Sequence, residues 1–340
     1  MRGIRICLIA AIALGVAGVA GAAGPKVLTD DGVLYSAGTR DNQVVVTARY
    51  ADDTVSEFFV PQSAAAVESS LQVGVDEASG ALYVLWQKLE GMDARLRVAG
   101  FIDGTWIGPR TFAGSDGIAA YNPALLIDRS VIETVEGVDE NDEPIIGESA
   151  ISFLHLVWWS QISEEDAGLA SYAAIELRDD GTPIWNSMDP IELYDLLPYG
   201  VGCFEFEAGD NLRHPKLFVD PRSGHPHVFA TDLASCHFQI LEILPTIEED
   251  EQTLEKRRRQ IIILRHASAI ALRPDLPLKS GRLEIGSGLS LLMHWDSDER
   301  DAVLYQKLDE EGISETKALD LDEDLNHEQA VELIRELARR

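Results

Sequence analysis

A hairpin-like unit recurs along this sequence and constrains its fold more than any other feature. The unit starts at a proline or leucine, continues as an apolar run and ends at an aspartate: Pro123–Asp128 reads PALLID, Pro215–Asp220 reads PKLFVD and Leu71–Asp76 reads LQVGVD. After Asp76 and Asp220 a second apolar run ends ten residues later, at Trp86 and Ala230. Pairs of short strands at regular intervals are typical of a repeated β-hairpin architecture.

The second run of the clearest unit, Ala81–Gln87, is apolar on both faces. Tyr83 and Leu85 point to one side of the expected strand, and Val84 and Trp86 point to the other. A sheet with one solvated face alternates apolar and polar residues instead. Strands of this kind predict sheets that stack face to face around a ring, as the blades of a propeller do.

Four strands are expected within about 42 residues, the size of one propeller blade. They are Leu71–Asp76, Ala81–Gln87, Arg95–Ile102 and Thr105–Phe112, the last two joined by an Asp103-Gly104 turn that favours positive φ. We therefore predict an all-β fold, a β-propeller of five or six four-stranded blades with a short C-terminal helix. The count depends on how residues 260–280 are divided between blades.

The remaining units are less regular. Residues 32–61 predict a partial first unit with three strands, and residues 123–189 a third unit that is interrupted by an acidic excursion at 131–150. In the fourth unit, residues 247–259 (IEEDEQTLEKRRR) place Glu255 and Arg259 at i and i+4, as in a solvated helix. We expect this stretch to be a surface insertion, with a basic patch for nucleic acid as the alternative. Residues 260–272 contain two strand-like runs, QIIIL and ASAIAL, and residues 282–296 restore the pattern.

The N-terminus has the pattern of an export signal. Arg2 and Arg5 precede an apolar run at Ile6–Val19, and Ala20-Gly21-Ala22 supplies the small residues of a cleavage site. We predict a signal peptide at 1–23, a propeller at 24–322 and an amphipathic helix at 323–340, in a periplasmic or secreted protein. An uncleaved N-terminal anchor is the alternative; after cleavage we expect no stable membrane insertion.

The C-terminal segment carries helix signals. Asn326 is the expected N-cap, with Gln329 completing a capping box. The expected apolar face contains Ala330, Leu333, Ile334 and Leu337. We expect this helix to pack on the propeller, with docking of a partner as the alternative.

The chain is strongly acidic, with 28 basic and 58 acidic residues. Without Arg2 and Arg5 the balance is 26 against 58, a formal charge of −32. Such a chain is repelled by nucleic acid, so we expect none as a partner. Of the three cysteines, Cys7 lies in the signal, which leaves Cys203 and Cys236 as a disulfide candidate or as two buried thiols.

The unit as a whole, a proline, a strand, an aspartate, a glycine-containing turn and a strand ending near tryptophan, resembles the repeats of sialidase-like β-propellers. The resemblance covers most of residues 71–321 and implies a ring of four-stranded blades. Two features differ from the catalytic members. Asp103-Gly104-Thr105-Trp106 is more compact than the family's Asp-box and lacks its serine, and the sequence has no Arg-Ile-Pro tripeptide of the arginine triad. The resemblance therefore implies the fold and a degenerate, non-catalytic member.

Several metal-binding patterns are incomplete. Tyr83, His155 and His227 occupy equivalent places in their units, which favours a role within the repeat. A zinc site would need three or four converging ligands from a set that adjoins the fourth unit: His214, His225, His227, Cys236 and His237.

Calcium patterns are incomplete as well. Asp320, Asp322 and Asp324 have calcium-loop spacing, but Leu325 and Val331 replace the required glycine and glutamate. The group Asp139, Asn141 and Glu143 is equally incomplete. We expect no metal site and no cofactor, with loose calcium binding by acidic loops as the alternative.

Long connections between the expected blades indicate where a ligand could bind, because loops on a rigid scaffold commonly hold function. The candidate ligand-binding residues near the central channel are Tyr121, Asn122, Tyr199, Glu205, Asp210, Arg213 and His214. The sequence has no G-x-S-x-G or H-E-x-x-H motif, and we assign no catalytic residue. The predicted function is an exported, non-catalytic module that binds a protein or a glycan; the alternative is a sialidase-like glycoside hydrolase.

Overall fold

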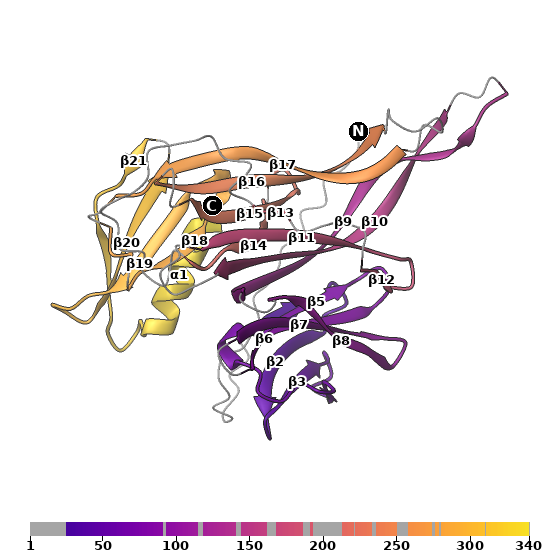
Figure 1. Ribbon diagram of the computed structural model, residues 1–340. Helices are drawn as coiled ribbons and strands as arrows, with labels where there is room; N and C mark the ends of the chain where they lie inside the picture. Colours follow the sequence, from indigo (N-terminus) through magenta and orange to yellow (C-terminus); the bar gives the residue numbers. More distant parts are fainter. Residues whose placement is uncertain are drawn as a thin grey trace, which may run out of the picture.

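The computed structural model describes residues 25–90, 93–114, 118–140, 144–161, 168–185, 191–192, 213–220, 222–232, 236–249, 258–273, 276–278, 280–309 and 311–339. The predicted signal peptide lies outside these residues. Five antiparallel sheets follow one another along the chain and form a five-bladed β-propeller, which confirms the predicted fold class (Figure 1).

The first two blades are regular four-stranded sheets. Blade 1 consists of β1 (Lys26–Leu28), β2 (Leu34–Arg40), β3 (Gln43–Arg49) and β4 (Val55–Phe59). After the 3₁₀ helix η1 (Glu68–Ser70), blade 2 consists of β5 (Gln72–Asp76), β6 (Ala81–Glu90), β7 (Asp93–Ile102) and β8 (Thr105–Ala113). The first unit is therefore a complete blade, because β1 supplies the strand that the sequence pattern did not indicate.

The last three blades contain longer or divided strands. Blade 3 consists of β9 (Ala119–Val138), β10 (Pro144–Gln161), β11 (Leu169–Leu177) and two short pieces paired with β11, namely β12 (Pro183–Ile184) and β13 (Ile191–Glu192). Blade 4 consists of β14 (Lys216–Val219), β15 (Pro226–Asp232), β16 (His237–Glu249) and β17 (Arg258–Ala271). Blade 5 consists of β18 (Arg282–Ile285), β19 (Leu291–Asp296), β20 (Ala302–Asp309) and two pieces paired with β20, namely β21 (Gly312–Ile313) and β22 (Lys317–Asp320); the 3₁₀ helix η4 (Ser287–Leu289) precedes β19.

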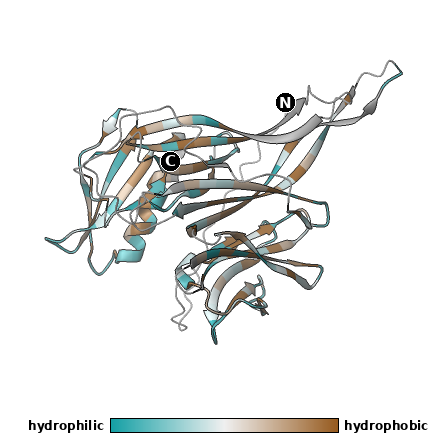
Figure 2. Ribbon diagram, viewed as in Figure 1, coloured by the Kyte–Doolittle hydropathy of each residue, from teal (hydrophilic) through white to brown (hydrophobic). Residues whose placement is uncertain are grey.

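Both faces of the inner strands are buried between blades, as predicted. In β6, Tyr83 and Leu85 belong to the apolar cluster shared with blade 3, whereas Val84 and Trp86 belong to the cluster shared with blade 1. All four side chains are 0% exposed. Figure 2 shows hydrophobic residues along the strands and hydrophilic residues at many of the turns.

The repeated aspartate closes the first hairpin of its blade. Asp76 accepts a hydrogen bond from Ser79 in blade 2, and Asp220 accepts one from Ser223 in blade 4. The following glycines, Gly80 and Gly224, have φ of 74° and 71° and donate their N–H groups to the carbonyl oxygen of the aspartate. The recurring sequence pattern therefore specifies a turn.

Polar contacts also connect neighbouring blades. Ser152 of blade 3 donates a hydrogen bond to Asp76 of blade 2 over 2.7 Å, and the Tyr83 hydroxyl donates to the carbonyl oxygen of Gly181. Lys216 of blade 4 donates to the carbonyl oxygen of Leu283 in blade 5. These contacts fix the blades relative to one another in addition to their apolar packing.

The free face of blade 5 is covered by helix α1 (His327–Arg339). Leu291 and Met293 of β19 face blade 4, while Leu292 faces the helix in a cluster with Ala330 and Ile334. Consecutive blades share four apolar clusters, and none of the clusters formed by the described residues joins blade 5 to blade 1. The helix thus buries the face of the last blade that is turned away from blade 4.

The predicted capping box of α1 is confirmed. Asn326 Oδ1 accepts the N–H of Gln329 over 3.0 Å, and Gln329 Oε1 accepts the N–H of Asn326 over 2.9 Å. The predicted apolar face is correct at Ala330 and Ile334, which are 0% exposed. It is wrong at Leu333 and Leu337, which are 41% and 43% exposed, because the helix turns its Ala338 side toward the sheet instead.

Two predictions for long insertions are corrected. The acidic excursion at 131–150 continues the ladder of β9 and β10, which pair from Val131↔Ala150 to Val138↔Pro144. The helix-like spacing in the expected surface insertion at 247–259 is misleading at both ends, where Glu249 and Arg258, and Glu248 and Arg259, are register partners in the β16–β17 hairpin. No helix in the described part of the chain has the length and apolar character needed to cross a membrane.

Candidate functional site

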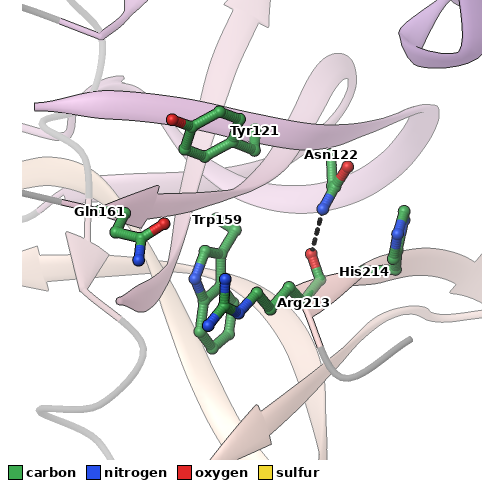
Figure 3. Close-up of a pocket in the computed structure, with 6 residues that line it drawn as sticks. All are labelled: Tyr121, Asn122, Trp159, Gln161, Arg213 and His214. Atoms are coloured by element: carbon green, nitrogen blue, oxygen red, sulfur yellow. Dashed lines mark hydrogen bonds between the residues drawn. The ribbon is translucent and has the colours of Figure 1, made fainter. Parts of the chain in front are cut away.

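A cavity of about 290 Å³ lies at the junction of blades 3 and 4. Its six described lining residues come from three places that are distant in sequence: Tyr121 and Asn122 on β9, Trp159 and Gln161 at the end of β10, and Arg213 and His214 before β14 (Figure 3). This arrangement follows from the topology, because the start of β9 pairs with the end of β10 and the next blade begins beside them.

A β-bulge shapes one wall of the cavity. The register of β9 and β10 passes from Val157↔Ala124 to Trp159↔Tyr121, so two residues of β9 stand opposite one residue of β10. Asn122, within the bulge, has φ of 49°, a left-handed conformation that asparagine tolerates better than most residues. Bulges redirect side chains and are common beside functional sites.

The bulge directs Asn122 toward the next blade. Its Nδ2 atom donates a hydrogen bond to the carbonyl oxygen of Arg213 over 2.8 Å. In Figure 3 the Arg213 side chain extends from that region of the backbone toward Trp159. The position of Arg213 is therefore linked to the conformation of the β9 bulge.

Two of the residues that line the cavity each carry a buried donor atom with no acceptor among the described residues. Trp159 is 2% exposed, and its indole Nε1 is buried without a hydrogen-bond partner. The Nε atom of Arg213 is likewise buried without a partner. Buried donors in native proteins are almost always hydrogen-bonded, so each unpaired donor at a cavity requires an explanation.

Gly168 controls how closely the chain approaches Trp159. Its φ is +74°, and a Cβ atom placed there would lie 2.2 Å from Trp159 Nε1. A side chain at this position is therefore incompatible with the observed indole position.

The cavity differs in charge from the rest of the molecule. Arg213 carries a permanent positive charge. None of the six described lining residues is acidic, although the chain contains 58 acidic residues. With two aromatic rings, two amides, an imidazole and a guanidinium group, the site suits a ligand rich in hydroxyl or other acceptor oxygens.

The structure brings together four of the seven predicted ligand-binding residues: Tyr121, Asn122, Arg213 and His214. The other three, Tyr199, Glu205 and Asp210, lie outside the described residues. Trp159 and Gln161 were not predicted. The signal that could have identified Trp159 is the pair Trp158-Trp159, since adjacent strand residues face opposite sides and one ring was left without a role in the repeat.

Cys236 is disulfide-bonded, so it is not a buried free thiol. Cys7 and Cys203 both lie outside the described residues, so pairing with Cys203 stays a prediction.

The three equivalent positions Tyr83, His155 and His227 each bond within the scaffold. His155 Nδ1 lies 2.7 Å from the Tyr172 hydroxyl, and His227 Nδ1 lies 2.9 Å from the carbonyl oxygen of His225. Burial lowers the pKa of His155 to about 3, so this imidazole is neutral. These contacts support a structural role for the repeated position.

Where the structure describes residues of the incomplete metal patterns, several of their side chains bind other protein groups. His225 Nδ1 donates to Glu242 over 2.6 Å, and Asp320 pairs with Arg300 over 3.2 Å. Asp322 accepts the N–H groups of Asp324 and Leu325 ahead of α1. Asn141 and Glu143 lie outside the described residues. Within the described residues, no group of three or more histidine, cysteine or acidic side chains is placed to hold a metal ion.

No protein-family model and no curated protein matches this sequence. The chemistry of the cavity is therefore the feature that indicates a function.

Proposed function

We propose that this protein is an exported, non-catalytic binding module that holds a glycan unit in the cavity between blades 3 and 4. The observation that carries the proposal is that two residues lining one cavity, Trp159 and Arg213, each hold a buried donor without a partner among the described residues, Trp159 Nε1 and Arg213 Nε. A glycan supplies hydroxyl and ring oxygens as acceptors, and its C–H faces pack against aromatic rings such as Tyr121 and Trp159.

The dimensions of the cavity support a small ligand. Its volume of about 290 Å³ is at the lower end of ligand sites, which commonly span roughly 300–1,000 Å³. A site of this size suits one or two sugar rings rather than an extended protein surface. Insertion of a partner's side chain is the competing form of binding.

The export part of the proposal is supported by the N-terminal pattern of Arg2 and Arg5, the apolar run and the small residues that follow. Expression of the full chain in a Gram-negative host, fractionation and intact mass measurement would test it. We expect a periplasmic or secreted product that begins near residue 24. A product that retains the N-terminal residues in the membrane fraction would contradict export.

A glycan array tests the binding function directly. We expect wild-type protein to bind a subset of immobilised glycans and Arg213→Gln to lose that binding. The matched control is Arg265→Gln, an exposed arginine that pairs with Glu242 in blade 4 and is not among the described lining residues. Absence of any bound glycan, together with a partner protein whose capture is abolished by Arg213→Gln, would replace the glycan with a protein ligand.

Glycoside hydrolysis is the alternative that the resemblance to sialidase-like propellers suggests. Such enzymes commonly use two carboxylates flanking the bond, and none of the six described lining residues supplies one. Glu205 and Asp210, in the connection that leads to Arg213, are the candidates in sequence. Turnover of aryl glycosides at several pH values, abolished by Glu205→Gln or Asp210→Asn, would establish the hydrolase and overturn the non-catalytic assignment.

A further inference from the structure

One face of blade 1 belongs to none of the apolar clusters that the described residues form. Val46 and Phe58 lie on the opposite face, in the cluster shared with blade 2. The residues that alternate with them along the strands face away from blade 2. Three of these are apolar and exposed: Leu28 is 68% exposed, Val55 is 55% exposed and Phe59 is 44% exposed. We refer to this side of β1–β4 as the free face of blade 1.

Strand register arranges the free face in rows. Leu28, Leu34, Arg49 and Val55 are successive register partners from β1 to β4 and form one row across the sheet. At the usual spacing of strands this row is about 14 Å wide. Lys26 lies two residues from Leu28 on β1, in the next row. An apolar stripe therefore runs beside a lysine across the whole blade.

The free face carries more basic than acidic residues. Lys26, Arg40 and Arg49 face Glu57 alone among the acidic residues of the strands. Arg40 pairs with Glu57 and Arg49 pairs with Asp53 of the adjoining turn, each over 2.6 Å. Lys26 is exposed and has no ion pair in the described part of the chain. Because the chain has 58 acidic and 28 basic residues, the free face is a place where an acidic surface can approach without net repulsion.

Helix α1 exposes a surface with the opposite charge. Leu333 and Leu337 are 41% and 43% exposed, and their i,i+4 spacing places them on the same side of the helix. Glu336 next to them is exposed and has no ion pair with a described residue. We refer to these three residues as the outer side of α1. The helix has 13 residues, so it is about 20 Å long and can cross the four strands of a blade.

The two surfaces are separate within one chain. Figure 1 shows α1 against blade 5 and apart from blade 1. Ala330 and Ile334 hold the helix on blade 5, and the buried cluster around Trp86 holds blade 1 on blade 2. Bringing α1 onto blade 1 of the same chain would disrupt one of these buried clusters. A second copy can provide each surface to the other without moving either.

From this complementarity we propose that two copies of this chain form a reversible dimer, in which α1 of each copy packs on the free face of blade 1 of the other. Leu333 and Leu337 cover the row that contains Leu28 and Val55, and Glu336 pairs with Lys26. A two-fold axis repeats this contact, as in the isologous interfaces of most homodimers.

The dimer is weak and depends on protein concentration. A contact through one helix of about 20 Å is small, and two such contacts lie at the lower end of the area that specific interfaces bury. None of the contact residues is among the described lining residues of the cavity. Dimerisation is therefore independent of the proposed glycan site.

Sedimentation equilibrium of the full chain over a wide range of concentrations measures the dimer. We expect the average mass to rise from monomer toward dimer, and we expect L333Q/L337Q and L28T/V55T each to raise the dissociation constant at least tenfold. Glutamine keeps the helix preference and threonine keeps the strand preference. The control L89T/V219T also replaces two exposed apolar residues, which are 51% and 41% exposed, and should change the constant less than twofold.

Exchange of charges tests the pairing of Lys26 with Glu336. K26E and E336K should each raise the dissociation constant at least threefold, because each brings like charges together. The double variant K26E/E336K should return to within twofold of wild type. Lys317 is an exposed lysine of β22, and the control K317E/E336K should stay as weak as E336K alone.

Four outcomes would overturn the proposal. A monomer at every concentration would exclude the dimer, and an equal loss in L89T/V219T would indicate non-specific apolar association. Loss of the dimer in L28T/V55T but not in L333Q/L337Q would show that the free face binds a surface other than α1. Weak association of K26E/E336K, no better than either single variant, would contradict the stated arrangement of the two surfaces.

Discussion

Asn122 on blade 3 donates its side-chain N–H to the carbonyl oxygen of Arg213 ahead of blade 4, over 2.8 Å. The donor sits in a bulge with a left-handed backbone, and the acceptor residue carries the guanidinium group that lines the cavity. This hydrogen bond therefore links the conformation of β9 to the junction between blades 3 and 4. It also links that conformation to the position of Arg213, the only permanently charged residue among the described lining residues.

Two substitutions of Asn122 should measure separately how much its hydrogen bond contributes to stability and how much its left-handed backbone conformation costs another residue. Asn122→Gly keeps access to positive φ and should cost about 1 kcal/mol for the lost hydrogen bond. Asn122→Ala loses the bond and adds about 1–2 kcal/mol because alanine disfavours the left-handed region. Urea unfolding of the three proteins measures both effects. Equal stability of the alanine and glycine variants would show that the φ of Asn122 is not required.

Gly168 should be essential for the cavity. Gly168→Ala places a methyl group against the Trp159 indole, so we expect loss of stability beyond backbone strain and loss of ligand binding. Gly224→Ala is the matched control, since Gly224 has φ of +71° with nothing within 4 Å of an added Cβ. The control should lose only the roughly 1–2 kcal/mol of left-handed strain. Similar urea midpoints for the two variants would contradict the close approach at Trp159.

Glu284 on β18 accepts a hydrogen bond from Arg335 of α1 over 3.2 Å, so the attachment of α1 should be sensitive to acid. Burial by itself would raise the pKa of Glu284, but the hydrogen bond from His294 and the charges of Lys216 and Arg335 lower it to about 2. The ionised form is therefore favoured by folding. Its stabilising contribution is present above pH 4.5, the ordinary value for glutamate, and is lost as the pH falls toward 2.

Glu284→Gln removes this pH-dependent contribution. Between pH 5 and pH 2, the free energy of unfolding from urea titrations should fall less steeply for Glu284→Gln than for wild type. Glu57→Gln is the control, because Glu57 pairs with Arg40 at an exposed site where solvent screens the charges. The Glu57 variant should follow the wild-type curve closely. An equally steep fall in Glu284→Gln would show that this carboxylate does not stabilise the fold.

Two adjacent residues of α1 should differ sharply in their effect on stability. Ile334 is 0% exposed against Leu292 and Val303, so Ile334→Ala should cost about 2–4 kcal/mol. Leu333 is 41% exposed, and Leu333→Ala should change stability by less than about 0.5 kcal/mol. Urea unfolding and amide exchange along the helix measure the difference. A larger cost at Leu333 would mean that the helix packs through its other face.

Much of the propeller could be predicted because its strands are apolar on both sides. Tyr83 and Trp86 indicate burial between two neighbours, and the structure places one against blade 3 and the other against blade 1. The number of blades could not be fixed because β17 was interpreted as two strands. Leu241 pairs with His266 and Ile240 with Ser268, so a bulge at Ala267 interrupts the apolar pattern inside one continuous strand.

Local charge spacing misled the prediction for residues 247–259. Glu255 and Arg259 suggest a helical ion pair, but the backbone of Arg259 belongs to β17, where it is the register partner of Glu248 in β16. Cross-strand pairing between residues that are distant in sequence overrides local helix preference, and it cannot be recognised from i,i+4 spacing alone.

Only part of the candidate site could be predicted from the sequence. Residues at the start of a blade's first strand can be placed from the repeat, whereas those at the end of its second strand cannot. Tyr121, Asn122, Arg213 and His214 precede or begin first strands, which places them near the channel mouth in any propeller. Trp159 and Gln161 end a second strand, and the neighbouring Trp158 already accounted for the tryptophan of the repeat. The bulge at Asn122 has no sequence signature of its own.

Trp159 is the residue whose donor the proposed glycan site needs most. Calorimetric titration of the tightest glycan from the array into wild type, Trp159→Phe and Trp86→Phe tests this directly. Trp86 is a matched control, since its Nε1 is also buried without a partner but lies between blades 1 and 2. We predict at least a tenfold loss of affinity for Trp159→Phe and less than a twofold change for Trp86→Phe. Wild-type affinity in Trp159→Phe would contradict the proposed site.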